Sequence, residues 1–433
     1  MTTKKKKVLH IANENSLGGG IGTVIDYLME GLNSSEEFSS DTFFTNYSSK
    51  NFAPLESTFY SGEIKEKQRV DQNRLESMLD DYDLIHVHGI PNYGVLESLK
   101  KVKSNVGKKP KIINTAHSSV KQEFQVHYEK LRDSQEVHPS NKEDFENLDK
   151  YLKKDMLNVP GPFADTYWGS AINRQEQIMT MSDAVQHMNE AYKNSIIQEY
   201  MAEENAPKHF VIPNGVKTVK SASPLPKKKR LLYVGRFGKE KGIDELVGSL
   251  PYIFEEHPDT EIRIVGGDKE GKITEKYRKK TENLMRTYFE DPSRKSKHNL
   301  EDYLSRIKFT GWIGDKKEIE KQYRWSNYVI IPSKYESFSL TAAEALMHGR
   351  IPIITQTPAM DDLYVSKNIA FGIKENMRNP RGIYQTVSEI FNEVNSEGQE
   401  KMAEEGKKYA KNNYSYEAMI LNQKELYKSL LEK

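Results

Sequence analysis

The chain has 433 residues, enough for two or three domains that each bury a core, and its 64 basic and 63 acidic residues leave no overall field of one sign. This balance argues against a nucleic-acid partner, and the absence of cysteine excludes disulfides and thiolate metal sites. No apolar run approaches the roughly 18 residues that span a bilayer, and Val8 to Ala12 is too short for the core of a signal peptide. We therefore expect a soluble cytoplasmic protein.

Short apolar runs alternate with amphipathic stretches along most of the chain, which is the pattern of α/β domains with parallel sheets. The strands expected in the first half are Val8–Ala12, Leu84–His88, Lys111–Thr115, Gln177–Met181 and His209–Ile212. Those expected in the second half are Arg230–Val234, Glu261–Val265, Ile307–Phe309, Tyr328–Ile331 and Ile351–Thr355. The two groups predict an α/β fold with two Rossmann-like domains.

A segment between the two groups of strands has the composition of an exposed linker. Thr218 to Lys229 consists mostly of small, proline and charged residues. We place the domain boundary there, which predicts a first domain over residues 1–217 and a second domain over residues 230–411. Residues 412–433 form a C-terminal helical segment.

A glycine-rich loop, Leu17 to Val24, follows the first expected strand and precedes a helical run. Glycines let backbone N–H groups approach an anion closely, so Gly19 and Gly20 are candidate binding residues. The loop does not match the dinucleotide pattern G-x-G-x-x-G, because Thr23 stands at the last position. A plain turn would need one glycine, and the four glycines within five residues favour a functional loop.

Histidines mark the edge at which parallel strands end, and open α/β sheets place their ligands at this edge. His117 follows the third expected strand, so it should face the cleft between the domains, although a lone histidine is more often structural. His86 and His88 alternate along one strand and could share a metal ion. Because no third ligand cluster accompanies them, we interpret them as polar residues at the cleft edge.

Two segments are longer than this skeleton requires. Lys269 to Arg306 is dense in charge, which predicts a solvated pair of helices. Val120 to Ser170 carries aromatic residues and a Pro-Gly-Pro turn. Its aromatic residues either belong to the core of the first domain or shape an acceptor pocket there.

The second half opens with a strand, a tight glycine turn and two cations that precede a helix. Within Leu232 to Asp244, these cations are Arg236 and Lys241. Two cations at a strand end complement a diphosphate, and each charge-assisted hydrogen bond contributes roughly 1.5 to 3 kcal/mol. The alternative is that both are ordinary surface cations.

The stretch from Pro332 to Leu346 places two carboxylates, Glu336 and Glu344, around a loop that opens a helix. The free N–H groups of a helix start favour a phosphate, and a carboxylate accepts hydrogen bonds from sugar hydroxyls. This combination suits a nucleotide sugar. The structural alternative for Glu344 is a capping box with Thr341.

These motifs resemble the donor site of the retaining glycosyltransferases of family 4, and the resemblance continues through Gly349 and Pro352. It implies the two-domain GT-B fold, in which a C-terminal helix, here Tyr416 to Leu431, crosses back to the first domain. It also implies a role for each candidate residue. The implied catalytic residues are His117 and Glu336, and the implied donor-binding residues are Gly19, Gly20, Arg236, Lys241, Ser337, Phe338, Ser339, Leu340 and Glu344. The chain departs from the family pattern at Ser337 and Ser339, where many members have glycine.

The resemblance implies a retaining hexosyltransferase that moves a hexose or N-acetylhexosamine from a UDP-linked donor to an acceptor hydroxyl. The acceptor stays open between a glycan, a lipid-linked carrier, a protein and a small molecule, as does peripheral contact with a membrane. We expect no required cofactor and no metal. Asp81 and Asp83 spell the acid-x-acid pattern of metal-dependent sugar transferases, but they precede a strand as a turn would. A nucleotide-sugar epimerase with the same architecture and a noncatalytic subunit that binds sugar nucleotides are the alternatives.

Overall fold

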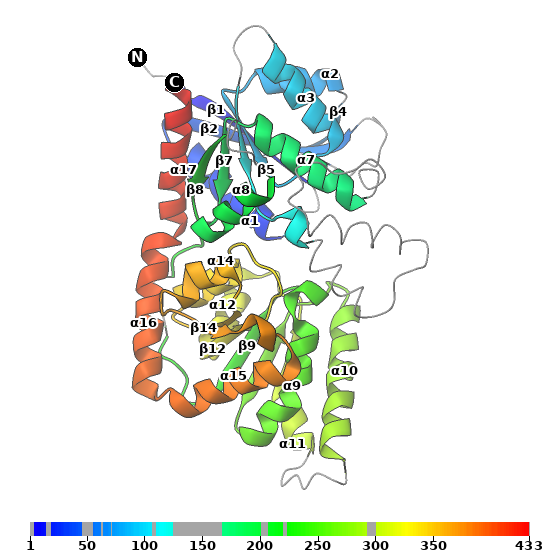
Figure 1. Ribbon diagram of the computed structural model, residues 1–433, viewed down its shortest axis with the longest axis vertical. Coiled ribbons are helices and arrows are strands. Elements are labelled where there is room, and N and C mark those ends of the chain that lie inside the picture. Colours follow the sequence, from blue (N-terminus) through cyan, green and yellow to red (C-terminus); the bar gives the residue numbers. More distant parts are fainter. Residues whose placement is uncertain are drawn as a thin grey trace. The chain divides into compact units, whose positions relative to one another are not determined.

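The computed structural model describes residues 4–13, 19–45, 55–61, 64–70, 72–105, 110–123, 167–200, 207–219, 223–291 and 300–432. The chain divides into two compact units (Figure 1). The first unit comprises Met1–Gly215 and Tyr416–Lys433, and the second comprises Val216–Ser415. The chain therefore passes between the units twice, and the segment that we predicted as a linker, Thr218 to Lys229, falls within the second unit.

The first unit is built on an eight-stranded sheet with the order β4-β3-β2-β1-β5-β6-β7-β8. Its strands are β1 (Lys6–Asn13), β2 (Phe38–Thr45), β3 (Leu55–Ser61), β4 (Ile64–Val70), β5 (Leu84–His88), β6 (Lys111–Thr115), β7 (Ala184–His187) and β8 (Lys208–Val211). Neighbouring strands in the part β2-β1-β5-β6-β7-β8 pair in parallel. Strand β3 pairs antiparallel with β2, and β4 pairs antiparallel with β3. The parallel part of the sheet places the carboxyl ends of β1, β5 and β6 side by side.

Among the described residues, the helices of the first unit are α1 (Gly20–Asn33), α2 (Gln72–Asp80), α3 (Tyr93–Ser104), α7 (Tyr167–Met181), α8 (Glu190–Tyr200) and α17 (Tyr416–Leu431). Helix α17 has the range expected from the sequence and packs against α1 (Figure 1). The two helices approach closely at Gly31, because a Cβ atom there would come within 2.5 Å of the Ile420 side chain. Helix α3 contacts both α2 and α7.

The second unit is built on a six-stranded parallel sheet with the order β11-β10-β9-β12-β13-β14. Its strands are β9 (Arg230–Val234), β10 (Glu261–Val265), β11 (Ile307–Gly311), β12 (Tyr328–Ile331), β13 (Ile351–Thr355) and β14 (Phe371–Ile373). Strand residues such as Leu231, Ile264 and Ile353 belong to one hydrophobic core with the helices that cover the sheet. Continuous apolar strands of this kind are typical of a sheet buried on both faces.

The helices of the second unit are α9 (Ile243–Glu256), α10 (Lys272–Phe289), α11 (Leu300–Ser305), α12 (Lys316–Trp325), α13 (Leu340–Met347), α14 (Pro358–Met360), α15 (Pro380–Glu393) and α16 (Ser396–Asn413). The described part of this unit also contains the short helical turns η4 (Lys239–Lys241), η5 (Asp361–Val365) and η6 (Glu375–Met377). Among the described residues of the chain, no helix is both long and apolar enough to cross a membrane.

The predicted α/β fold is confirmed, and one predicted strand is wrong. Gln177 to Met181 is the last part of helix α7, and the strand that follows it is β7. Its apolar residues Ile178 and Met179 are buried on one side of this helix, so a short apolar run was mistaken for a strand. Strands β2, β3, β4 and β14 were not predicted from the sequence.

The segments of uncertain role are partly described. Helix α10 is not solvated all round, because Tyr277, Thr281, Met285 and Phe289 form a buried stripe along it. Residues 124–166, which hold most of the proposed acceptor segment, lie outside the described residues. At the predicted linker, the buried guanidinium of Arg350 donates to the backbone oxygens of Ser223 and Pro224, which fastens this stretch to the second unit.

Candidate functional site

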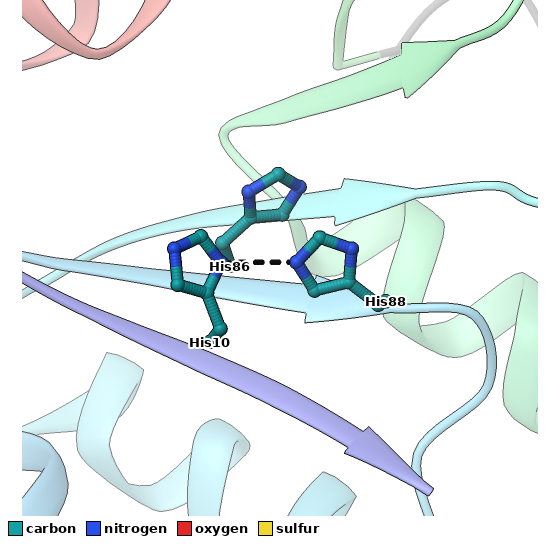
Figure 2. Close-up of side chains that lie close together, drawn as sticks. All are labelled: His10, His86 and His88. Atoms are coloured by element: carbon teal, nitrogen blue, oxygen red, sulfur yellow. Dashed lines mark hydrogen bonds between the residues drawn. The ribbon is translucent and has the colours of Figure 1, made fainter. Parts of the chain in front are cut away.

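Three histidines meet on one face of the first sheet, near the carboxyl ends of β1 and β5 (Figure 2). His10 and His86 are directly opposite in the parallel pairing of these strands, and His88 lies two residues further along β5. Side chains two apart along a strand share a face, so the pairing register alone brings the three rings together. All three rings are buried, with at most 3% of each residue exposed.

Hydrogen bonds extend this group to His117. Nδ1 of His10 lies 3.0 Å from Nε2 of His88, and Nδ1 of His88 lies 3.2 Å from Nε2 of His117. His86 stands beside this chain, with Nδ1 at 2.7 Å from the Tyr427 hydroxyl and Nε2 at 2.5 Å from the Thr115 hydroxyl. The interpretation that His86 and His88 lack a third partner is therefore wrong, because β1 supplies His10.

Burial keeps these imidazoles neutral at ordinary pH. It lowers the pKa of His10 to about 3 and that of His117 to about 4. Burial first, and then neighbouring histidines, lower the pKa of His86 and of His88 well below the usual value. Neutral imidazoles have free lone pairs, so His10, His86 and His88 could hold a metal ion. Their arrangement is equally that of neutral rings that hydrogen-bond to one another.

The described part of the glycine loop caps helix α1. Gly19 is its N-cap residue with an extended backbone, and the helix begins at Gly20. The backbone N–H and the hydroxyl of Thr23 both donate to the Gly19 carbonyl oxygen, at 3.0 Å and 3.2 Å. Both glycines are exposed. Leu17 and Gly18 lie outside the described residues, so the anion-binding role of the loop stays a prediction.

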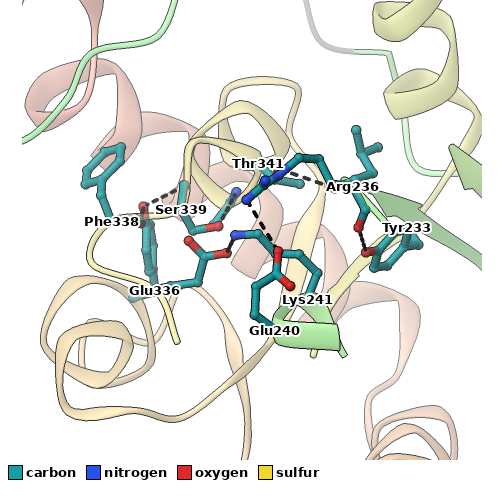
Figure 3. Close-up of polar contacts among 11 residues, drawn as sticks. Tyr233, Arg236, Glu240, Lys241, Glu336, Phe338, Ser339 and Thr341 are labelled. Carbon is teal, nitrogen blue, oxygen red and sulfur yellow. Dashed lines mark hydrogen bonds and ion pairs between the residues drawn. The ribbon is translucent and has the colours of Figure 1, made fainter. Parts of the chain in front are cut away.

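Charged residues of the second unit gather at the carboxyl edge of its sheet (Figure 3). Nζ of Lys241 donates to Oε1 of Glu336 at 2.6 Å, and both side chains are largely buried. Arg236 forms an ion pair with Glu240 at 3.3 Å, but its side chain is 79% exposed. The structure thus brings together two candidates, Lys241 and Glu336, from loops that are far apart in the sequence.

A glycine allows the two loops to approach. Gly242 has φ of +68°, and a Cβ atom there would come within 2.0 Å of the Pro332 carbonyl oxygen. A side chain at this position would therefore push the Lys241 loop away from the Glu336 loop. Nearby, the backbone N–H of Lys334 donates to the Glu240 carbonyl oxygen at 2.8 Å.

The loop before helix α13 has an unusual cap. Ser339 is the N-cap residue with φ of +65°, and its side chain accepts from the backbone N–H of Ala342. Positive φ in a residue other than glycine is strained and often marks a functional loop. The buried Tyr364 hydroxyl donates to the Phe338 carbonyl oxygen at 2.6 Å, which helps to hold the loop. The left-handed backbone explains why glycine would also suit position 339.

This cap corrects the structural alternative for Glu344. Helix α13 begins at Leu340 with Ser339 as its cap, so Thr341 is not a cap residue and no capping box forms with Glu344. The Tyr323 hydroxyl instead donates to Oε2 of Glu344 at 2.7 Å. Burial raises the pKa of Glu344, while the hydrogen bond from Tyr323 opposes that rise. Ser337 and Leu340 are half-buried beside the buried Phe338.

A second glycine loop of the second unit was not predicted from the sequence. Gly266 and Gly267 follow β10 with φ of +143° and +103°. A Cβ atom on Gly266 would come within 1.8 Å of the Gly235 carbonyl oxygen, so this loop is pressed against the loop that carries Arg236. Asp268 then accepts from the backbone N–H of Ile273 at 2.8 Å at the start of α10. The sequence feature that could have predicted this loop is the Gly-Gly-Asp run directly after an apolar strand.

The acid-x-acid pattern has a structural explanation. Asp81 lies in a turn before β5, and the Asp83 carboxylate accepts from the backbone N–H of Lys7 at 2.9 Å. The Tyr82 hydroxyl between them donates to Asp41 at 2.9 Å. These contacts agree with the interpretation of the pattern as a turn into a buried strand.

Comparison with known proteins adds to this geometry. Residues 217–409 match the family model described as glycosyl transferases group 1. An uncharacterized glycosyltransferase of Methanocaldococcus jannaschii is 26% identical over 205 residues, which cover 47% of this chain and 46% of that protein. The chain spans about half the length of curated relatives of this kind.

Solved structures resemble the whole chain. Sucrose-phosphate synthase from Thermosynechococcus elongatus has a TM-score of 0.67 and 17% identity, with 99% of this chain and 100% of that chain covered. HepE from Anabaena, solved in complex with UDP and glucose, has a TM-score of 0.60 and 13% identity, with 98% and 100% covered. At these identities the likeness shows the fold alone.

Proposed function

We propose that this chain, which carries a glycosyltransferase group 1 domain over residues 217–409 and has the GT-B fold, transfers a sugar with retention of configuration. The sugar would be a hexose or N-acetylhexosamine, moved from a UDP-linked donor to an acceptor hydroxyl. The observation that carries the proposal is the contact between Lys241 and Glu336 beside the capped start of α13. The complex of HepE with UDP and glucose supports the choice of donor.

The charged edge of the second unit suits a nucleoside diphosphate. Lys241 has three N–H donors, so it can keep its bond to Glu336 and still donate to a phosphate oxygen. Arg236 is exposed and can leave Glu240 for the same diphosphate. The start of α13, with Ser337, Phe338, Ser339 and Leu340, would add backbone N–H donors and its positive dipole end.

Carboxylates would orient the neutral parts of the donor. Glu336 is fixed by Lys241, so its second oxygen can accept from a hydroxyl of the donor sugar. Glu344 is fixed by Tyr323 in the same way and would accept from the ribose hydroxyls. Because each carboxylate is held by one donor, it would lose little conformational entropy when it binds a sugar.

In the first unit, His117 would lie beside the transferred sugar, with Gly19 and Gly20 near the donor diphosphate. His117 is neutral at ordinary pH because burial lowers its pKa to about 4, so it would contribute a hydrogen bond rather than a charge. The acceptor would attack the face that the diphosphate leaves, and leaving-group oxygens would take its proton. With cations at the diphosphate, transfer would need no metal and would persist in excess chelator.

A mass-spectrometric screen of the purified chain tests the activity. UDP-sugars are offered with pools of glycans, lipid-linked carriers, peptides and small molecules, each with and without EDTA. We expect a product whose mass rises by one sugar residue and whose new linkage keeps the anomeric configuration of the donor. A UDP-sugar converted to an isomer without any acceptor would identify an epimerase instead, and would contradict the proposal.

Calorimetry with UDP tests the donor site. Lys241→Met removes one charge-assisted hydrogen bond, which should weaken UDP binding by about tenfold or more. The matched control is Lys280→Met, which breaks a surface pair with Asp244 in the same unit. It should leave UDP affinity unchanged. Equal affinities in both variants and the unmodified chain would remove the diphosphate assignment.

A further inference from the structure

We propose that Tyr323 is a positioning residue that determines how strongly Glu344 holds the ribose hydroxyls of the donor nucleotide. Tyr323 is buried, so it acts through Glu344 rather than on the donor itself. This inference rests on the proposed role of Glu344 at the ribose and deepens it. It makes the selectivity for a ribose depend on a side chain from another helix.

Tyr323, from α12, packs on one face of α13. Glu344 and His348 lie on this face, because residues four apart along a helix are neighbours, and the backbone N–H of His348 donates to the Glu344 carbonyl oxygen at 3.0 Å. The Tyr323 hydroxyl donates to Oε2 of Glu344 at 2.7 Å. The Tyr323 ring stacks on the His348 imidazole, with 4.9 Å between the centroids and 10° between the planes. The polar end of Tyr323 therefore contacts the carboxylate, while its ring is fixed by the imidazole.

The backbone of Tyr323 is also restrained. The backbone N–H and the hydroxyl of Ser326 both donate to the Tyr323 carbonyl oxygen, each at 3.0 Å. Tyr323 is 1% exposed, and Ser326 and His348 are buried beside it. A side chain restrained at its backbone and at its ring can hold a partner in one orientation. Glu344, which is only half-buried, would then lose little conformational entropy when a ribose binds.

The bond between Tyr323 and Glu344 favours the ionised carboxylate. Burial, and then the nearby Glu344, raise the pKa of Tyr323 well above its usual value, so the hydroxyl keeps its proton and donates. Burial raises the pKa of Glu344, whereas the hydrogen bond from Tyr323 and the charge of Lys316 lower it. Tyr323 thus extends the pH range in which Glu344 is charged toward lower pH. An ionised carboxylate accepts more strongly from a hydroxyl than a neutral carboxyl group does.

The other charged groups of this region act on His348. Burial first, and then Arg350, Arg324 and Lys407, lower the pKa of His348 to about 4. The imidazole is therefore neutral at ordinary pH, and it restrains the Tyr323 ring without adding a charge beside the carboxylate. Among the described residues, Tyr323 and Lys316 act directly on the carboxylate of Glu344, and both come from α12.

The rival explanation is that the hydrogen bond only satisfies the hydroxyl of a buried tyrosine. Buried tyrosine hydroxyls usually have an acceptor, and their loss then lowers the stability of the fold. Under this explanation, removal of the Tyr323 hydroxyl changes the melting temperature but not the contribution of the ribose hydroxyls to binding. The two explanations therefore make different predictions for binding.

Calorimetry with UDP and with 2′,3′-dideoxy-UDP measures this contribution as the ratio of the two dissociation constants. We expect a ratio of about tenfold or more in the unmodified chain, and of less than about threefold in Tyr323→Phe. The ratio should decrease because UDP binds more weakly, while the affinity for the dideoxy analogue stays the same and shows that the site is folded. Tyr384→Phe is the matched control, since it removes a tyrosine bond to a different carboxylate, Glu256, in the same unit. It should keep the ratio of the unmodified chain.

A pH series separates positioning from a structural role. UDP affinity is measured between about pH 5 and about pH 8 for each chain with Glu344 and for the same chain with Glu344→Gln. Protonation of the diphosphate affects both members of a pair alike, so the ratio of their affinities follows the ionisation of Glu344. We expect this ratio to decrease as the pH falls, and to do so at a higher pH in Tyr323→Phe than in the unmodified chain. The Tyr384→Phe pair should follow the unmodified pair.

Two results would overturn the inference, whatever happens to the melting temperature. One is a ratio between dideoxy-UDP and UDP that is unchanged or larger in Tyr323→Phe, and the other is a pH series that coincides with that of the unmodified chain. The proposed function fails in a different way, because its failure appears before any substitution. An unmodified chain that binds UDP and the dideoxy analogue equally would remove the ribose role of Glu344, and a chain that binds no UDP would remove the donor assignment. Either result would overturn the inference as well.

Discussion

The polar residues of the two units differ in charge and exposure. In the first unit, His10, His88 and His117 are buried, neutral and bonded to one another. In the second unit, Lys241 pairs with Glu336 near an exposed Arg236. A neutral network can be buried without a counter-charge, so it can form part of the core and still orient a ring. A partly exposed ion pair contributes little to the stability of the fold, so its charged groups can exchange their partner for a charged ligand at a small cost.

Acid should distinguish the two regions most clearly. Burial lowers the pKa of His10 to about 3 and that of His117 to about 4, from 6.5 in both cases. Because the unfolded chain binds these protons more readily, the stabilisation is complete above pH 6.5 and is lost as the pH falls toward the folded pKa. From pH 7 to pH 5 the loss should be about 2 kcal/mol for each histidine.

Hydrogen exchange followed by mass spectrometry, corrected for the intrinsic rate, measures this loss by segment. Between pH 7 and pH 5, peptides from β5 should lose protection against hydrogen exchange, and peptides from β12 should lose less of this protection. Equal losses in the two strands would show that the histidine cluster is not what makes the first unit sensitive to acid.

A backbone substitution should break the second unit's site without touching a charge. Gly242→Ala places a Cβ atom within 2.0 Å of the Pro332 carbonyl oxygen and requires a left-handed backbone. We expect the free energy of unfolding to fall by about 3 kcal/mol and UDP binding to weaken. Gly271→Ala is the matched control, since Gly271 has φ of +76° but no atom of the described residues lies within 4 Å of the new Cβ.

The control should cost only about 1 kcal/mol, the price of the left-handed conformation alone. Thermal melting of both variants gives the comparison. Similar melting temperatures would mean that the Lys241 loop moves freely, and that ion pairs rather than backbone contact position the charged edge.

The smallest expected change in stability concerns Glu344. Burial raises its pKa, so the folded state holds this proton more tightly, and the ionised side chain lowers stability at pH 7. This destabilisation disappears as the pH falls through the raised pKa of Glu344 toward the ordinary pKa of a glutamate. The buried histidines have the opposite effect, because they lose stabilisation as the pH falls. Glu344→Gln keeps an acceptor for Tyr323 and should therefore melt within about 1 kcal/mol of the unmodified chain.

The same variant should raise the KM for the donor, because an amide oxygen accepts more weakly from ribose hydroxyls than a carboxylate does. Melting curves and donor kinetics on one preparation separate the two effects. A large loss of stability with unchanged kinetics would make Glu344 a structural residue.

Much of the second unit was predictable from its sequence. The ranges of β9, β10, β12 and β13 agree with the prediction, because each is a short apolar run between polar loops. In the first unit, β5 and β6 agree for the same reason, but β3 and β4 were missed. Their sequences, LESTFYS and IKEKQRV, contain no long apolar run of the kind that marks the central strands.

The local sequence predicted where the loops of the candidate site lie, but it did not predict which residues of these loops contact one another. Arg236, Lys241 and Glu336 were predicted as cations and a carboxylate at strand ends, which is a local pattern. The bond between Lys241 and Glu336 joins residues 95 apart, and no local pattern predicts it. The left-handed backbone of Ser339 was likewise hidden, because serine rarely adopts it.

The sequence by itself determined where most central strands lie, that glycines and charged residues follow them, and that the chain has an α/β fold. These features depend on the periodicity of apolar residues and on turn residues, and both are set by residues that are close together in the chain. Only the tertiary structure decided that His10 joins His88, 78 residues away, because that contact requires β1 to pair with β5 in one register. A shift of one residue would move His10 to the other face of the sheet and remove the cluster.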